Sequence, residues 1–185
     1  MKRTVTILVA CAAILGGMAV MGQDKKATPD SSQTKKIRIG TYDNRAIAIA
    51  WGGSKYNPVG QKMEELKKAK ADGDTKKIEE LEKWGPAMQR KLHRQGFGKV
   101  PVDDLLVAVK DRLPEVAKKT GVVAIVWQSD FAGENVEVVD VTTELVKLFD
   151  PSEKVLRWTN PEELKKNAPL DIEYIEKHQD DMPKR

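Results

Sequence analysis

The stretch from Val102 to Asp150 constrains the fold most, because helix and strand signals alternate within it. Its first part predicts a helix that Asp103 or Asp104 caps. Apolar residues then recur at helical spacing: Leu105, Leu106, Val109, Leu113 and Val116. Pro114 predicts a kink or a break in this helix, and Gly121 predicts its left-handed end.

Two β-branched segments follow this helix. The continuous apolar run 122–127 predicts a strand covered on both faces. Residues 133–135, Gly-Glu-Asn, predict a turn, and residues 136–141 predict a second strand. Asp140 or Thr142 is then expected to cap a short helix. The apolar side of that helix contains Leu145, Val146, Leu148 and Phe149.

A further strand is predicted before this stretch, at Ile37–Tyr42, where Ile37 and Ile39 share one face. Asp43 then suits the cap of a short helix over residues 45–51. The alternative is that the strand continues through Ile47 and Ile49. Residues 52–54, Gly-Gly-Ser, end either element.

Residues 57–94 predict a helical hairpin. Asn57-Pro58 indicates a helix start, and the tight turn 72–74, Asp-Gly-Asp, separates two charged amphipathic segments. Asp74 suits the cap of the second helix, and Gly85-Pro86 predicts a kink within it. Two such helices joined by a tight turn are expected to lie antiparallel.

Residues 116–126 and 138–146 resemble the OmpH family of Skp-like periplasmic chaperones. The shared pattern is a helix ending in Lys-x-Gly, an apolar strand, and an Asp-apolar-Thr sequence that opens the last helix. Residues 37–43, Ile-Arg-Ile-Gly-Thr-Tyr-Asp, are similar to the family's first strand. The resemblance implies a homotrimer with a small β core and helical arms that hold unfolded outer-membrane proteins. The hairpin here is shorter than the family's arms, which makes the chain a short-armed variant.

Together these signals predict an α+β fold. A small mixed sheet from Ile37–Tyr42, Val122–Trp127 and Val136–Val139 would carry the projecting antiparallel hairpin. So small a sheet has open edges and a thin core, and we therefore expect the chain to oligomerise through the sheet. The domain spans residues 37–150. The tail 151–185 lies outside the resemblance; it either wraps the core or contacts a partner, and it includes a possible short helix over residues 170–178.

Residues 1–22 have the order of a secretory signal peptide: a basic start, an apolar segment without charge, then small residues. Cleavage after Gly22 would leave a polar, disordered tether over residues 23–36. We therefore expect a periplasmic protein; retention of the segment as a membrane anchor is the alternative. Cys11 sits in a sequence like a lipid-attachment site, but the apolar run continues beyond it, which disfavours lipidation. Cys11 is the only cysteine, so cleavage would leave no thiol or disulfide chemistry.

Composition and spacing disfavour other functional classes. Without residues 1–22 the chain has 30 basic and 28 acidic residues, interleaved along it, which argues against a nucleic-acid partner. His93 and His178 lie in unrelated segments, and solvated histidines at helix ends explain both better than a metal site. Residues 96–98, Gly-Phe-Gly, are too short for a phosphate loop. Asp43 and Asp140 both follow strands, but helix capping explains them more simply than acid–base catalysis. We expect no enzyme activity, no cofactor and no metal.

The leading hypothesis is an exported, ATP-independent chaperone-like protein that binds unfolded or outer-membrane polypeptides. Its client-binding surface would be the inner side of the hairpin, formed by Met63, Leu66, Leu81, Trp84 and Met88. The alternative for Trp84 is ordinary packing between the hairpin helices or at a subunit interface. The alternative function is a structural or assembly protein of the cell envelope without client-holding activity, which the short hairpin and the extra tail favour.

Overall fold

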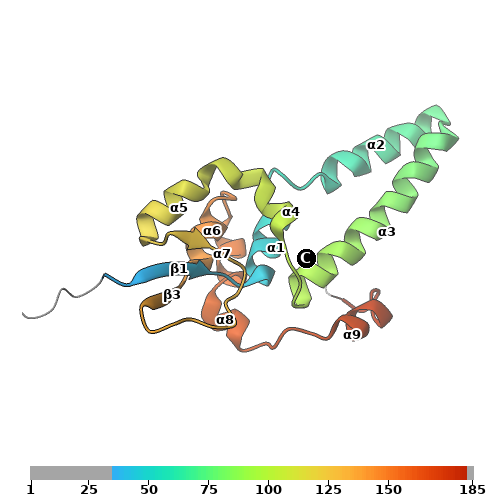
Figure 1. Ribbon diagram of the computed structural model, residues 1–185. Helices are drawn as coiled ribbons and strands as arrows, with labels where there is room; N and C mark the ends of the chain where they lie inside the picture. The colour runs from blue at the N-terminus through green and yellow to red at the C-terminus, as the bar shows by residue number, and fades with distance from the viewer. Residues whose placement is uncertain (1–34, 183–185) are drawn as a thin grey trace, which may run out of the picture. The chain divides into compact units, whose positions relative to one another are not determined.

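The computed structural model describes residues 35–182, which belong to one compact unit. This part of the chain combines helices with a small three-stranded sheet, which agrees with the α+β prediction at that level (Figure 1). The predicted signal peptide 1–22, with Cys11, lies outside the described residues. So does the predicted tether 23–36, except for its last two residues.

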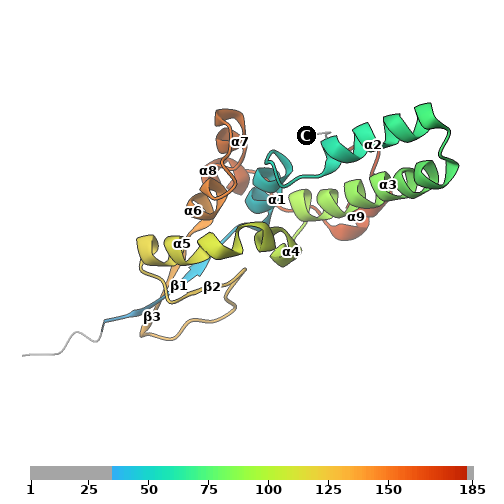
Figure 2. The ribbon, with the colours of Figure 1, turned by 90° about the horizontal axis from the view of Figure 1, so that it is seen from above.

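The sheet is parallel. β1 (Ile37–Thr41) lies between β2 (Ala124–Ile125) and β3 (Val136–Asp140), and both neighbours run parallel to it. The prediction of a mixed sheet is therefore wrong. Residues 126–135 carry the chain from the end of β2 to the start of β3, and this crossing keeps the two strands parallel (Figure 2). The predicted turn is present at the end of that segment, where the N–H of Val136 donates to the carbonyl of Gly133 at 2.9 Å.

One face of the sheet is open. The register places three residues side by side on this face: Ile39, Ala124 and Val138. On the opposite face, the core face, it places Gly40, Ile125 and Val139. On the open face the side chain of Val138 is 43% exposed, and Ile37 is also exposed. The run 122–127 is thus not covered on both faces as predicted, because Val123 and Val126 are exposed and β2 spans only two residues.

α1 (Asn44–Gly52) is a buried helix. Asp43 is its N-cap, and the Asp43 carboxylate accepts the N–H of Arg45 at 2.9 Å, as predicted. Six consecutive apolar residues in α1 are 9% exposed or less: Ala46, Ile47, Ala48, Ile49, Ala50 and Trp51. A helix that is apolar around its whole circumference is typical of a buried position. The alternative of a strand continuing through Ile47 and Ile49 is wrong.

The segment 57–94 forms two consecutive helices, α2 (Val59–Asp72) and α3 (Thr75–Phe97). The two helices contact each other and extend away from the sheet (Figures 1 and 2). Gly73 joins them with a φ of 71°, the left-handed conformation that glycine adopts without a Cβ penalty. Near this turn an ion pair between Lys70 and Glu82, at 2.8 Å, connects the two helices.

The predicted helix starts are confirmed in this segment. The Asn57 side chain accepts the N–H of Val59 at 3.1 Å, although the N-cap of α2 is Pro58, which was predicted as the first helical residue. The Asp74 carboxylate caps α3 and accepts the N–H of Lys77 at 3.0 Å. α3 continues through Pro86 as one helix, so the expected kink does not interrupt the element.

The helix predicted after Val102 is interrupted. It consists of α4 (Asp103–Leu106), the 3₁₀ helix η1 (Val107–Arg112) and α5 (Leu113–Thr120). Pro114 lies in the first turn of α5, where its missing N–H costs nothing, so the predicted break is confirmed. Gly121 ends α5 with a φ of 69°, also as predicted.

The predicted cap of this helix is wrong. Its N-cap is Val102, which makes no side-chain capping bond, and Asp103 and Asp104 lie in the first turn. The Asp104 carboxylate instead accepts the side-chain amide of Gln95 at 2.8 Å. The Asp104 carboxylate therefore bonds a side chain of α3 and does not cap its own helix.

α6 (Thr142–Lys147) follows β3 directly. The Asp140 carboxylate accepts the N–H of Thr142 at 2.9 Å, so Asp140 serves the helix start as expected, although the N-cap itself is Val141. Thr142 uses its hydroxyl to accept the N–H of Asp43 at 3.0 Å. The apolar side chains after β3 enter the core: Val141, Leu145, Val146, Leu148 and Phe149.

The tail 151–182 folds against the rest of the domain. It forms α7 (Glu153–Trp158), α8 (Pro161–Lys165) and α9 (Ile172–Lys177), the last of which was predicted. The buried tail residues are Val155, Thr159, Leu164, Ile175 and Met182. The N–H of Leu170 donates to the carbonyl of Phe97 at 2.8 Å, which ties the tail to the end of α3. Of the two alternatives, wrapping the core is therefore observed.

Candidate binding groove

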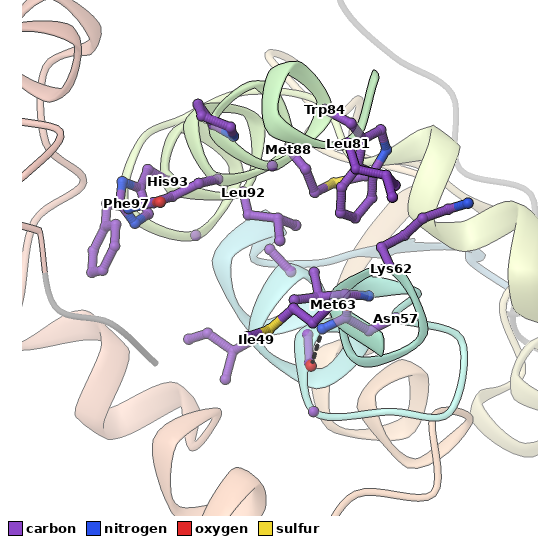
Figure 3. A pocket seen from close by; sticks show the side chains of 18 of the residues that line it. Ile49, Asn57, Lys62, Met63, Leu81, Trp84, Met88, Leu92, His93 and Phe97 are labelled. Atoms are coloured by element: carbon purple, nitrogen blue, oxygen red, sulfur yellow. Dashed lines mark hydrogen bonds between the residues drawn. The ribbon is translucent and has the colours of Figure 1, made fainter. Parts of the chain in front are cut away.

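A groove of about 720 Å³ opens between α2 and α3 (Figure 3). Residues at the end of α1 and in α7 also line it. The α2 residues that line it are Val59, Lys62, Met63 and Leu66. The α3 residues include Leu81, Trp84, Met88, Leu92, His93 and Phe97. α1 contributes Ala48 and Ile49, and α7 contributes Val155 and Trp158.

The helical period explains this lining. On α2, residues 59, 63 and 66 recur at three- and four-residue spacing, and on α3 the same spacing relates residues 81, 84, 88 and 92. Each helix therefore turns one apolar stripe toward the other. Towards the turn the stripes close on each other, because Ala69 and Leu81 are buried. Away from the turn the two helices leave the groove open.

All five residues predicted to bind clients line this groove. Met63 is the most accessible, with 64% of its surface exposed. Leu66, Trp84 and Met88 are half-buried, and Leu81 is buried. The structure thus brings the predicted set together, and four of the five retain surface that a ligand can contact.

The contribution of the tail to the groove escaped the sequence reasoning. Val155 and Trp158 come from the tail, far from α2 and α3 in sequence, and no local pattern connects them to these helices. His93 was predicted to be solvated, and this is wrong: it is buried, and its Nδ1 lies 2.9 Å from the Gln179 side-chain oxygen. His178 is half-buried at the end of α9, where its ring stacks on Tyr174.

The lining is mostly uncharged. Among the described residues that line the groove, Lys62 is the one with a permanent charge, and none is acidic. The Lys62 ammonium bonds both carboxylate oxygens of Glu65, at 2.8 and 3.1 Å. This hydrogen bond is the main cause that holds the pKa of Glu65 below its usual value. The groove therefore offers apolar contacts with one cation at its rim.

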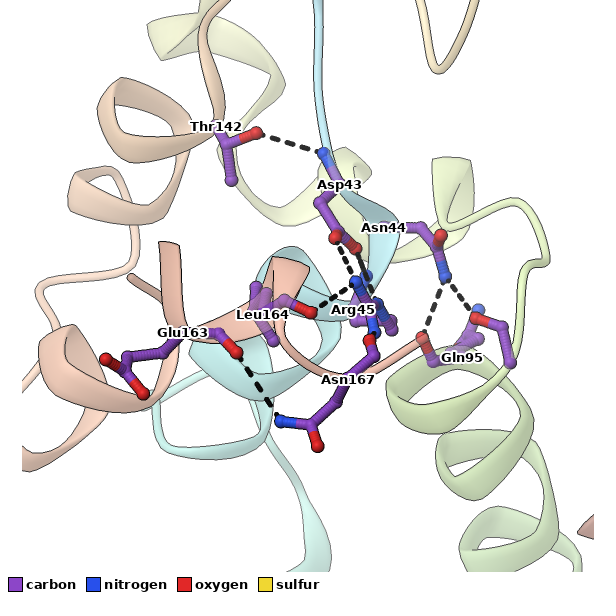
Figure 4. Close-up of polar contacts among 9 residues, drawn as sticks. Asp43, Asn44, Arg45, Gln95, Thr142, Glu163, Leu164 and Asn167 are labelled. Carbon is purple, nitrogen blue, oxygen red and sulfur yellow. Dashed lines mark hydrogen bonds and ion pairs between the residues drawn. The ribbon is translucent and has the colours of Figure 1, made fainter. Parts of the chain in front are cut away.

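A second cluster of polar side chains lies at the start of α1 (Figure 4). Arg45, which is buried, pairs with Asp43 at 2.6 Å. Its guanidinium also donates to the carbonyls of Asn167 at 2.6 Å and Leu164 at 3.2 Å. Nearby, the Asn44 side-chain amide donates to two carbonyls at the end of α3.

These bonds connect α1 to the tail and to α3, so their role is structural. Asp43 caps its helix and pairs with Arg45, and Asp140 bonds the start of α6. Capping was the simpler of the two roles predicted for both carboxylates. The Gln95 side-chain oxygen is buried near this cluster without a hydrogen-bond partner.

Within residues 35–182, no cluster of three or more His, Cys, Asp or Glu side chains is arranged to hold a metal ion. In the same residues, no helix is both long and apolar enough to span a bilayer. Comparisons with protein-family models, curated proteins and solved structures found no match to this chain.

Proposed function

We propose that this protein is an exported, ATP-independent chaperone-like protein that holds apolar segments of unfolded or outer-membrane polypeptides in the periplasm. The observation that carries the proposal is the groove between α2 and α3, which gathers the predicted residues Met63, Leu66, Leu81, Trp84 and Met88. Export rests on the basic and apolar pattern of residues 1–22.

The groove suits a flexible apolar segment. Its volume lies in the range of ordinary ligand sites, so it accommodates a few side chains of an extended chain and not a folded domain. Its surface includes Met63 and Met88, whose unbranched side chains adapt to ligands of different shape. A site for varied sequences needs such adaptability more than it needs fixed polar contacts.

The charge of the surrounding helices favours acidic clients. Residues 55–99, which include α2 and α3, contain twelve Lys and Arg and seven Asp and Glu. Residues 100–182 contain ten Lys and Arg and eighteen Asp and Glu. Residues 55–99 thus carry a net charge of +5, which would attract polypeptides with carboxylates near their apolar segments. Such attraction weakens as salt is added.

We extend the proposal to the arrangement of the two long helices and to the family of the chain. In it, α2 and α3 act as a projecting antiparallel hairpin, and the chain is a short-armed member of the OmpH family. What supports this view is the order of the elements. β1 and the short buried helix α1 precede the two long helices, and an interrupted helix, two strands and α6 follow them; the tail helices α7–α9 are additional.

Replacing Met63 by Asp is expected to weaken client holding about tenfold or more, because a carboxylate in an apolar groove lacks a partner. The measurement is light scattering of an unfolded outer-membrane β-barrel protein, diluted from urea into increasing amounts of the full chain. Val107→Asp is the matched control, because Val107 is similarly exposed, at 68%, but lies on η1 outside the groove.

Equal suppression of aggregation by the two variants would show that the groove is not the binding surface. No suppression by the unaltered protein would reject client holding altogether. The envelope-assembly function would then become the better hypothesis.

The second candidate function, a structural or assembly protein of the cell envelope, is favoured by a different observation. The open face of the sheet exposes Ile37 and Val138, and Phe131 in the crossing segment is exposed as well. Exposed apolar residues on one face of a sheet are typical of protein interfaces. A fixed partner or further copies of the chain would cover them.

We propose that three copies of the chain associate through this face to form a homotrimer. Val138→Lys is then expected to reduce the native mass, measured by light scattering on a sizing column, from trimer to monomer, because it places an unpaired charge in the interface. Val107→Lys should leave the mass unchanged. A monomeric unaltered protein would reject the trimer, and a trimeric Val138→Lys variant would place the interface elsewhere.

A further inference from the structure

The tail contributes one side of the groove. Val155 and Trp158 belong to α7, and both line the same cavity as Trp84 and Met63. Val155 is buried and packs with the core, which holds α7 in place. Trp158 remains 39% exposed, so its ring is available to a ligand. A segment lying in the groove would therefore contact the tail as well as the two long helices.

The Trp158 ring is held by its own helix. The Lys154 ammonium lies 4.5 Å from the centre of the ring, a cation–π distance. Thr159, the residue after it, donates its hydroxyl to the carbonyl of Val155 at 2.9 Å, which fixes the end of α7. A ring positioned in this way loses little freedom when it binds a ligand.

The chemistry of the groove points to aromatic ligands. Three aromatic rings line it, Trp84 and Phe97 from α3 and Trp158 from α7, together with the thioethers of Met63 and Met88. Aromatic rings gain energy from edge and offset contacts with other rings, and from contacts with sulfur, beyond what their buried area provides. An aliphatic side chain of similar size gains only the burial.

We propose that the groove selects polypeptide segments that carry aromatic side chains with carboxylates nearby, and that Trp158 is a specificity-determining residue. This inference rests on the proposed function, because it concerns the ligand of the same groove. The positive charge on residues 55–99 supplies the preference for acidic flanks. Trp158 supplies part of the preference for rings.

The test uses the full chain and three short fluorescein-labelled peptides of the same acidic sequence, with Phe, Leu or Ser at the same positions. Fluorescence polarisation gives each affinity. The Phe peptide is expected to bind about three- to tenfold more tightly than the Leu peptide, which corresponds to one or two ring contacts. The Ser peptide is expected to bind least.

Trp158→Leu should reduce the Phe peptide's advantage while the affinity for the Leu peptide stays nearly the same. Trp158→Phe should retain the advantage, which separates the loss of a ring from a general disturbance of α7. Leu156→Ala is the matched control, since Leu156 lies on the same helix with the same 39% exposure but does not line the groove.

The outcomes separate the two proposals. If no peptide binds, the proposed function fails. If the Phe and Leu peptides bind equally to the unaltered protein, the function stands and the aromatic selectivity is overturned. If Trp158→Leu keeps the full advantage, or weakens both peptides equally, the role of Trp158 in specificity is overturned.

Discussion

Arg45→Ala is expected to lower the free energy of unfolding by about 3 kcal/mol, near the lower end of the range for breaking a buried ion pair. The Arg45 side chain is 8% exposed, and its guanidinium bonds Asp43 at 2.6 Å, as well as the carbonyls of Asn167 and Leu164. Its removal leaves these acceptors without their charged donor. The Asp43 carboxylate is 28% exposed, so water compensates part of the loss.

Urea unfolding followed by circular dichroism measures this change. Lys55→Ala is the matched control, because the Lys55–Asp150 pair is exposed at both ends and is 3.4 Å long. It should cost less than about 1 kcal/mol. A cost for Arg45→Ala no larger than that of the control would mean that the Arg45 guanidinium does not hold the tail. If Arg45 holds the tail, the backbone amides of residues 164–170 are expected to exchange hydrogen faster in the Arg45 variant.

Gly98→Ala is expected to destabilise the protein by about 1–3 kcal/mol, the usual cost of overpacking. A Cβ at this position would lie 2.6 Å from Ile172 Cδ1 and 2.8 Å from the carbonyl oxygen of Arg94. The isoleucine methyl can move, but the backbone carbonyl cannot move without distorting the end of α3. The expected result is displacement of α9, because Ile172 and Ile175 pack on this glycine.

The control for this prediction lies two residues away. A Cβ at Gly96 would meet nothing within 4 Å, and Gly96 lies inside α3. Gly96→Ala should therefore leave stability unchanged or raise it by up to about 1 kcal/mol, because alanine favours a helix over glycine. Unfolding curves compare the two variants, and limited proteolysis reports on the tail. Equal stability of both variants would contradict the close packing at Gly98.

Features that depend on neighbours in sequence were predicted well. The cap at Asp43, the tight turn at 72–74, the cap at Asp74, the break at Pro114 and the left-handed Gly121 each depend on atoms within about one helical turn. The convergence of the five groove residues also follows from local pattern. Two amphipathic helices joined by a tight turn must bring their apolar stripes together.

Features that depend on distant parts of the chain were not predicted. An apolar run such as 122–127 reads the same whether a second layer covers it or not, so its exposed face was missed. The parallel direction of β3 depends on how residues 126–135 cross the sheet, whereas the sequence pattern of that segment predicted only a turn. His93 appeared solvated because its partner, Gln179, lies 86 residues away.

The sequence by itself therefore determined the two long helices, several of the helix ends and the inner stripe of the groove, because each of these is settled by short-range geometry. Tertiary structure alone decided the parallel sheet with its open face, the buried pairing of Arg45 and the return of the tail to the groove. Those features depend on contacts between segments that lie far apart in the chain. The free energy of those contacts depends on the whole fold and not on any local segment.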